Sequence, residues 1–186
     1  MPGWQRFYTQ YKDRNFELIS VAMDVQGAEK ARPWVEKADA SYVALVDALS
    51  ELGRQFDFNF IPLTLLIDED GRLVRGPKGT SIDRESDRAQ ISRWIEEGEL
   101  DSAPSSRANG FSGPEAELRF QAAAVILSRG DSAAAVELLR KALQFDPKNW
   151  LIRKQIWAIE SPDRFYAGPV DYEWQKRQLQ KEMPQR

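Results

Sequence analysis

Two short, almost continuous apolar runs constrain the fold of this chain more than any other feature. One run extends from Phe16 to Met23, and the other extends from Phe60 to Asp68 with Pro62 near its start. A run of this length that is rich in β-favouring residues is typical of a strand buried on both faces, as in a parallel sheet covered by helices. Residues 42–46 predict a third, shorter strand or an extended stretch. The runs therefore predict an α/β fold.

Helical and turn signals alternate with these strands. Aromatic side chains recur every three to four residues between Trp4 and Arg14, which favours an amphipathic helix. Asp70-Gly71 predicts a hairpin turn, because this dipeptide supplies the positive φ that a tight turn needs. Further helices are predicted after the first strand, before the second apolar run and after the hairpin, over 27–38, 49–56 and 81–98. The helix predicted over 27–38 can accommodate Pro33 only if this proline lies near its first turn.

The composition of the chain changes after residue 100. Residues 101–114 contain two prolines, two glycines and four serines, a composition typical of a flexible linker. Downstream of it the strand signals end, and helices are predicted over 115–128, 132–145, 150–159 and 172–183. The sequence therefore predicts an α/β domain over 1–100, a linker over 101–114 and an all-α helical segment over 115–186.

The composition also limits the chemistry of the chain. It has no cysteine and no histidine, so it lacks a thiol nucleophile, a disulfide and the usual neutral-pH general base. We predict no catalytic residue, metal or cofactor. The formal net charge of −3 gives no basic field for nucleic acid. No apolar run approaches the roughly 20 residues of a membrane span, and the N-terminus lacks the apolar core of a signal peptide, so the expected compartment is the cytoplasm.

The first hundred residues resemble a thioredoxin-like domain of the TlpA/ResA redoxin type, in the AhpC/TSA superfamily. The most specific part is Ile61-Pro62-Leu63-Thr64, which leads into Ile67-Asp68-Glu69-Asp70-Gly71. The resemblance implies a thioredoxin-like fold and a cis peptide bond at Pro62, beside the redox centre of the family. Without the resemblance, Pro62 would be interpreted as a trans proline at the start of a strand.

The sequence departs from this family at its beginning. In such redoxins a strand and a Cys-x-x-Cys turn precede the first helix, whereas this sequence begins with Met1-Pro2. It resembles an incomplete redoxin that lacks its N-terminal strand and its CxxC or UxxC motif. Three origins stay open: a gene start misplaced after a selenocysteine codon, deliberate trimming, or a genuine start with lost catalysis. The absent strand is central in the family, so two strands are expected to keep unpaired edges unless they close on each other or form a dimer.

The helical segment carries a second resemblance. Gly130-Asp131, Ala135, Ala142 and residues 146–149 are similar to the second half of a tetratricopeptide repeat, whose small residues let two helices approach closely. A single repeat cannot bury its face alone. We therefore expect the third helix to cap it with Trp150, Ile156 and Trp157.

The candidate binding site is Ile61, Pro62 and Leu63. In thioredoxin-like proteins the backbone beside the cis-proline pairs with an extended substrate chain, so these residues are expected to flank a peptide groove. A purely structural strand start is the alternative. Asp47 and Asp68 are interpreted as a helix cap and a turn residue rather than as a catalytic carboxylate pair.

Two functions follow as hypotheses. The resemblance implies that the chain is the main part of a thiol-disulfide oxidoreductase without its redox motif. The chain as given is then expected to be catalytically inert. The alternative is a redox-dead scaffold that binds a protein or peptide partner through the cis-proline groove or the tetratricopeptide-like helices.

Overall fold

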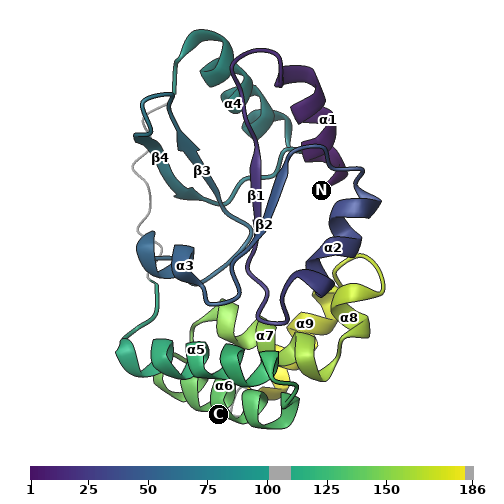
Figure 1. The fold of residues 1–186 in the computed structure, drawn as a ribbon, viewed down its shortest axis with the longest axis vertical. Coiled ribbons are helices and arrows are strands. Elements are labelled where there is room, and N and C mark those ends of the chain that lie inside the picture. Colours follow the sequence, from purple (N-terminus) through teal and green to yellow (C-terminus); the bar gives the residue numbers. More distant parts are fainter. Residues whose placement is uncertain (101–109, 183–186) are drawn as a thin grey trace.

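The computed structural model of this chain describes residues 1–100 and 110–182. It is a mixed α/β structure, in which the strands lie in the N-terminal part and the C-terminal part is helical (Figure 1). No helix within the described ranges is long and apolar enough to cross a membrane. The elements follow the chain in this order: α1 (Pro2–Tyr11), β1 (Ile19–Ala22), α2 (Ala28–Lys37), β2 (Val43–Val46), α3 (Glu51–Gln55), β3 (Thr64–Ile67), β4 (Leu73–Lys78), α4 (Glu85–Glu97), α5 (Pro114–Ser128), α6 (Ser132–Phe145), α7 (Trp150–Glu160), α8 (Asp163–Tyr166) and α9 (Tyr172–Glu182).

The four strands form two separate pairs. β1 and β2 run parallel with Ile19 opposite Val43, and β3 and β4 run antiparallel with Ile67 opposite Leu73. Within the described part of the chain, no ladder joins one pair to the other. In the view of Figure 1 the strands follow one another in the order β4, β3, β1, β2. The strands with unpaired edges therefore do not close on each other.

Burial of the first apolar run was predicted wrongly. Only four of its residues form β1, and the first of them, Ile19, is 57% exposed. All four residues of β2 are exposed as well. A strand is buried on both faces when a wide sheet is covered by helices on both sides. Here β1 has one neighbouring strand, so its side chains keep contact with solvent.

The hairpin between β3 and β4 confirms the turn prediction. The Asp68 N–H donates to the carbonyl of Arg72 over 2.9 Å, and Gly71 has a φ of 79°. The Asp68 carboxylate accepts the N–H groups of Asp70 and Arg72, at 3.1 and 2.8 Å. Asp68 is therefore a turn residue.

The position of Pro33 was predicted wrongly. It lies in the middle of α2 rather than in its first turn. A proline there removes one main-chain hydrogen bond and crowds the preceding turn. The helix tolerates it because Pro33 itself is exposed and no side chain of α2 is fully buried, so dense packing does not fix its geometry.

The helical segment begins with an antiparallel pair, α5 and α6. Their contact is made by small side chains, with Ala116, Ala123, Ala135 and Ala142 all buried. The Asp131 carboxylate accepts the Ala134 N–H over 3.0 Å and thereby caps α6. α7 follows, and its Ile156 and Trp157 are buried in the same hydrophobic cluster. Trp174 of α9 packs edge-on against Trp157, with ring centroids 5.8 Å apart.

A single hydrophobic core joins the α/β part to the helices. It contains Met23, Val25 and Phe58 from the first part together with Phe120 and Trp157 from the second. Polar contacts reinforce it: the Gln155 side chain donates to the Met23 carbonyl over 2.8 Å and accepts the Val25 N–H over 3.2 Å. Most of the predicted linker, residues 101–109, lies outside the described residues. A second, smaller cluster holds α1 against α4 through Phe7, Tyr11, Ile82 and Ile91.

Candidate functional site

The Ile61–Pro62 peptide bond is cis, which confirms the expectation from the redoxin resemblance. Pro62 is exposed and precedes β3 by two residues. The side chains of Ile61 and Leu63 are half-buried and pack against the core that the strands share with the helices. The predicted site residues therefore lie together, with the proline at the surface and its neighbours anchored below it.

Helix α7 contacts the segment in front of this proline. The Leu151 N–H, in the first turn of α7, donates to the Asn59 carbonyl over 2.9 Å. The Lys154 ammonium donates to the Ile61 carbonyl over 3.5 Å. A peptide that paired with the main chain beside the proline would use the Ile61 carbonyl. This carbonyl already accepts a hydrogen bond from Lys154 of the helical segment. No pattern in the sequence indicates this contact, because the partners are 92 and 93 residues apart.

An open cavity of about 380 Å³ lies where these segments meet. Its lining comes from the loop before the cis-proline, from α7 and from α9, and consists of Phe60, Ile61, Trp150, Lys154, Tyr172 and Gln175. Sequence reasoning found only Ile61 among them as a binding residue. The cavity volume is in the range of small-molecule sites in proteins, about 300 to 1,000 Å³.

Lys154 is the charged group of this cavity. Its side chain is half-buried, and burial lowers the pKa of its ammonium because water no longer solvates the charge fully. The contact with the Ile61 carbonyl is its single hydrogen bond within the described ranges, and no described carboxylate pairs with it. By contrast, the adjacent Arg153 pairs with Glu182. Lys154 is therefore a partly desolvated cation without a counter-ion among the described residues.

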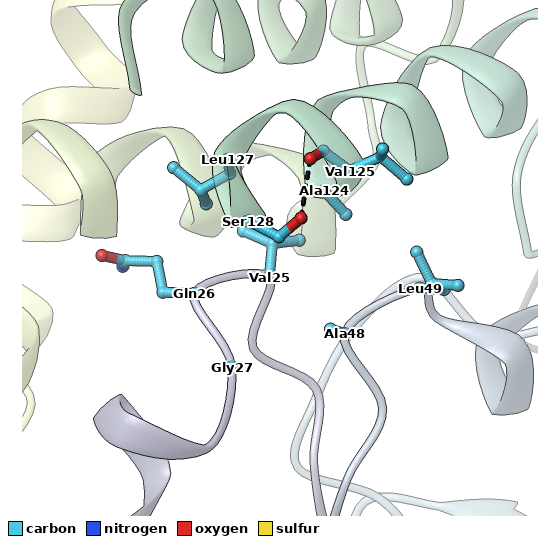
Figure 2. Close-up of a pocket in the computed structure, with 9 residues that line it drawn as sticks. All are labelled: Val25, Gln26, Gly27, Ala48, Leu49, Ala124, Val125, Leu127 and Ser128. Atoms are coloured by element: carbon cyan, nitrogen blue, oxygen red, sulfur yellow. Dashed lines mark hydrogen bonds between the residues drawn. The ribbon is translucent and has the colours of Figure 1, made fainter. Parts of the chain in front are cut away.

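A second cavity, of about 210 Å³, lies at the carboxyl ends of β1 and β2 against the last turns of α5. Figure 2 shows that its walls are mostly aliphatic, with Val25, Leu49 and Leu127 among them. Its two polar side chains have other partners: the Ser128 hydroxyl donates to the Val125 carbonyl and the Gln26 amide donates to Tyr166. Both polar side chains are thus engaged within the chain and the walls are mostly aliphatic, so we interpret this cavity as a packing gap at the junction.

Asp24 and Tyr166 form a half-buried polar link beside that gap. The Tyr166 hydroxyl donates to Asp24 over 2.7 Å and accepts the Gln26 side-chain amide over 2.8 Å. Burial raises the pKa of Asp24, and burial together with the Asp24 charge raises the pKa of Tyr166. These side chains hydrogen-bond to one another, and they thereby connect the loop after β1 with α8.

Asp47 and Asp68 do not form a pair. Asp47 accepts the N–H groups of Glu51 and Leu52 at the start of α3, at 2.9 and 2.8 Å, which confirms its interpretation as a cap. Among the described residues, no group of three or more acidic side chains is placed to hold a metal ion. Comparison with family models, with curated proteins and with solved structures finds no match for this chain.

Proposed function

We propose that this chain is a thioredoxin-like module that binds an extended polypeptide segment through the free edges of its strands. The observation that carries this proposal is the arrangement of the strands in two separate pairs. Every strand of such a pair has one edge whose main-chain N–H and C=O groups lack a strand partner. Strand addition uses these groups, and exposed edges of this kind are natural templates for another chain.

The side chains of the strands support the same function. Large apolar residues are exposed on both pairs, namely Ile19, Val43, Leu45 and Val46 on the first and Ile67, Leu73 and Val74 on the second. Full burial of one such side chain contributes roughly 1.5 to 3 kcal/mol. An incoming apolar segment would gain this contribution in addition to main-chain hydrogen bonds. The exposed Pro62 lies two residues before β3, where such a segment would end or enter.

The lack of cysteine limits what the module does after binding. Thiol-disulfide exchange starts with attack by a thiolate on a disulfide sulfur. This chain has no thiol, so binding is the activity that we assign to it.

A peptide-binding assay tests the proposal. The probe is a fluorescent eight-residue peptide that alternates valine with threonine, and its control carries two prolines that remove main-chain donors. We expect fluorescence anisotropy to rise with the first peptide and not with the second. Ile19→Lys should weaken binding at least ten-fold because it places a charge beside the free edge of β1. The matched control is Leu118→Lys, at a residue of α5 that is 62% exposed.

Two outcomes of this assay would contradict strand addition. One is equal binding of the valine–threonine peptide and its proline-containing control. The other is an equal loss of affinity in Ile19→Lys and Leu118→Lys. Circular dichroism of both variants checks that they keep the fold.

A second candidate function is favoured by the Ile61-Pro62-Leu63 segment that leads into the β3–β4 hairpin. This arrangement matches what the redoxin resemblance implies, and it supports the body of a thiol-disulfide oxidoreductase whose redox motif comes from residues outside these 186. An insulin-reduction assay separates the two candidates. The present chain should be inactive, and a version preceded by a strand and a Cys-x-x-Cys turn should be active. If the extended version is also inactive, the oxidoreductase candidate is wrong.

A further inference from the structure

The cavity beside the cis-proline contains a positive charge that no described carboxylate compensates. Cations of the helical segment commonly have carboxylate partners, as in Arg140 with Glu160 and Arg164 with Asp171. Lys154 has none within the described ranges, although its side chain is more shielded from water than those of Arg140 and Arg164. Desolvation of a charge costs free energy unless an opposite charge or good hydrogen bonds compensate it. A contact of 3.5 Å to one carbonyl gives little compensation.

Three aromatic side chains line the same cavity as this cation. Phe60, Trp150 and Tyr172 line the cavity, and all three keep part of their surface exposed to solvent. Tyr172 is 62% exposed. Partly exposed aromatic rings that meet at one cavity are typical of binding sites, because they offer a large apolar area with little conformational freedom to lose.

A second polar side chain faces the same space. Gln175 lines the cavity and is only 5% exposed as a residue. Its main-chain N–H donates to the Asp171 carbonyl, and its side-chain amide makes no hydrogen bond with another described residue. The cavity therefore has an ammonium group and an amide group available as donors.

We propose that this cavity binds a carboxylate attached to a flat apolar group. The Lys154 ammonium and the Gln175 amide donate to the carboxylate oxygens, and Trp150 and Tyr172 contact the apolar part. A carboxylate fits better than a phosphate group, because the site supplies one positive charge and two donor groups, whereas a phosphate monoester carries nearly two negative charges and three strong acceptors. The inference uses side chains of the loop, α7 and α9 and does not rest on strand addition.

Two sources can supply this chemistry: a small aromatic acid, or the C-terminal residue of a peptide. Isothermal titration calorimetry at pH 7 distinguishes them with two matched pairs of probes. The first pair is 3-phenylpropionate and 3-phenylpropionamide. The second is a hexapeptide ending in phenylalanine, with a free carboxylate or with a C-terminal amide. We expect the acid of at least one pair to bind at least ten-fold more tightly than its amide, and the pair that shows this identifies the source.

Variants test the role of the cation. Lys154→Met keeps the length of the side chain and should abolish the preference for the acid, whereas Lys154→Arg should retain part of it. Lys148→Met is the matched control, because Lys148 is exposed beside the start of α7 and lies outside the cavity. It removes the same charge and should preserve the preference. Ile19→Lys should also preserve it, so a failure of strand addition is distinguishable from a failure at this site.

A titration of the unaltered protein complements the variants. Carboxylate binding should raise the pKa of Lys154 towards its ordinary value, which NMR of the lysine side chains measures directly. Equal binding of acid and amide in both pairs would overturn the proposal. It would also be overturned if neither acid bound at millimolar concentration, or if Lys148→Met lost as much affinity as Lys154→Met.

Discussion

Asp146 shows how much structure one buried carboxylate can organise. It is 1% exposed and accepts the Ser112 N–H, the Ser112 hydroxyl and the Asn149 side-chain amide, at 3.0, 2.7 and 2.8 Å. Asn149 in turn accepts the Ile152 N–H and caps α7. Asp146 therefore ties the segment before α5 to the junction of α6 and α7.

We predict that Asp146→Ala lowers the free energy of unfolding by about 2 to 4 kcal/mol, because it leaves the buried Asn149 amide and the two part-buried donors of Ser112 without their acceptor. Urea denaturation followed by circular dichroism measures the change. Asp163→Ala is the control: Asp163 is exposed, and the change there should stay within about 0.5 kcal/mol. Similar losses in the two variants would show that the buried carboxylate has no special role.

Asp24 predicts a pH dependence of stability. Burial raises its pKa above 3.8, so between this value and the raised pKa the folded state binds more protons than the unfolded state. Stability therefore falls as the pH rises through this window. The pKa of Asp24 is lowered by hydrogen bonds from Tyr166 and Gln26 and by the charge of Lys30, but these effects offset the effect of burial only partly. Asp24→Asn should remove this fall, so that its stability relative to the unaltered protein increases from pH 4 towards neutrality. Parallel stability curves for the two proteins would contradict the assignment.

At the scale of elements, α2 offers the clearest test. Pro33 removes the hydrogen bond to the Glu29 carbonyl in the middle of this helix. We predict that Pro33→Ala raises the free energy of unfolding by about 1 to 2 kcal/mol, a gain reduced by the greater freedom of the unfolded chain. Thermal unfolding and far-ultraviolet circular dichroism measure it. Pro169→Ala, in an exposed bend outside any helix, should bring no gain. A loss of stability in Pro33→Ala would show that α2 requires its proline.

Elements whose signals are local were predicted well from the sequence. The bounds of α6 agree with the predicted 132–145, and the β3–β4 hairpin follows its Asp-Gly turn. Helix α8 was missed, because four residues after Pro162 are too few to show a periodic pattern. The exposure of β1 was also missed, because the number of neighbouring strands is a property of the whole sheet.

The residues of the candidate site likewise fall into those with a local sequence signal and those without one. Ile61, Pro62 and Leu63 were predicted from a short motif; the structure confirms the cis bond at Pro62, and only Ile61 of the three lines the cavity. Apart from the adjacent Phe60, the other cavity residues are on α7 and α9, about ninety or more residues away, where their spacing is that of ordinary amphipathic helices. A single sequence reports the face of a helix but not the loop against which this face packs. In the sequence, Lys154 is an ordinary charged residue, and only the structure shows that no described carboxylate pairs with it.

At the scale of the molecule, the shared core predicts one cooperative unfolding transition. Phe58 belongs to the α/β part and Phe120 to the helices, and both are buried in the same cluster. We expect Phe58→Ala and Phe120→Ala each to lower the free energy of unfolding by about 3 to 5 kcal/mol. Tryptophan fluorescence and circular dichroism should then shift together in each variant. Leu118→Ala, at an exposed position of α5, serves as the control. Two separate transitions would show that the parts unfold independently.

The bond from Leu151 to Asn59 has a consequence for the order in which the molecule is made. A ribosome adds about 5 to 20 residues per second, so it needs roughly 5 to 20 s to proceed from Phe58 to the end of the helix that covers it. During this interval Met23, Val25 and Phe58 are already synthesised while their helical partners are not. These apolar side chains then lack the surface that buries them in the finished molecule, so the incomplete chain is more prone to aggregation than the complete one.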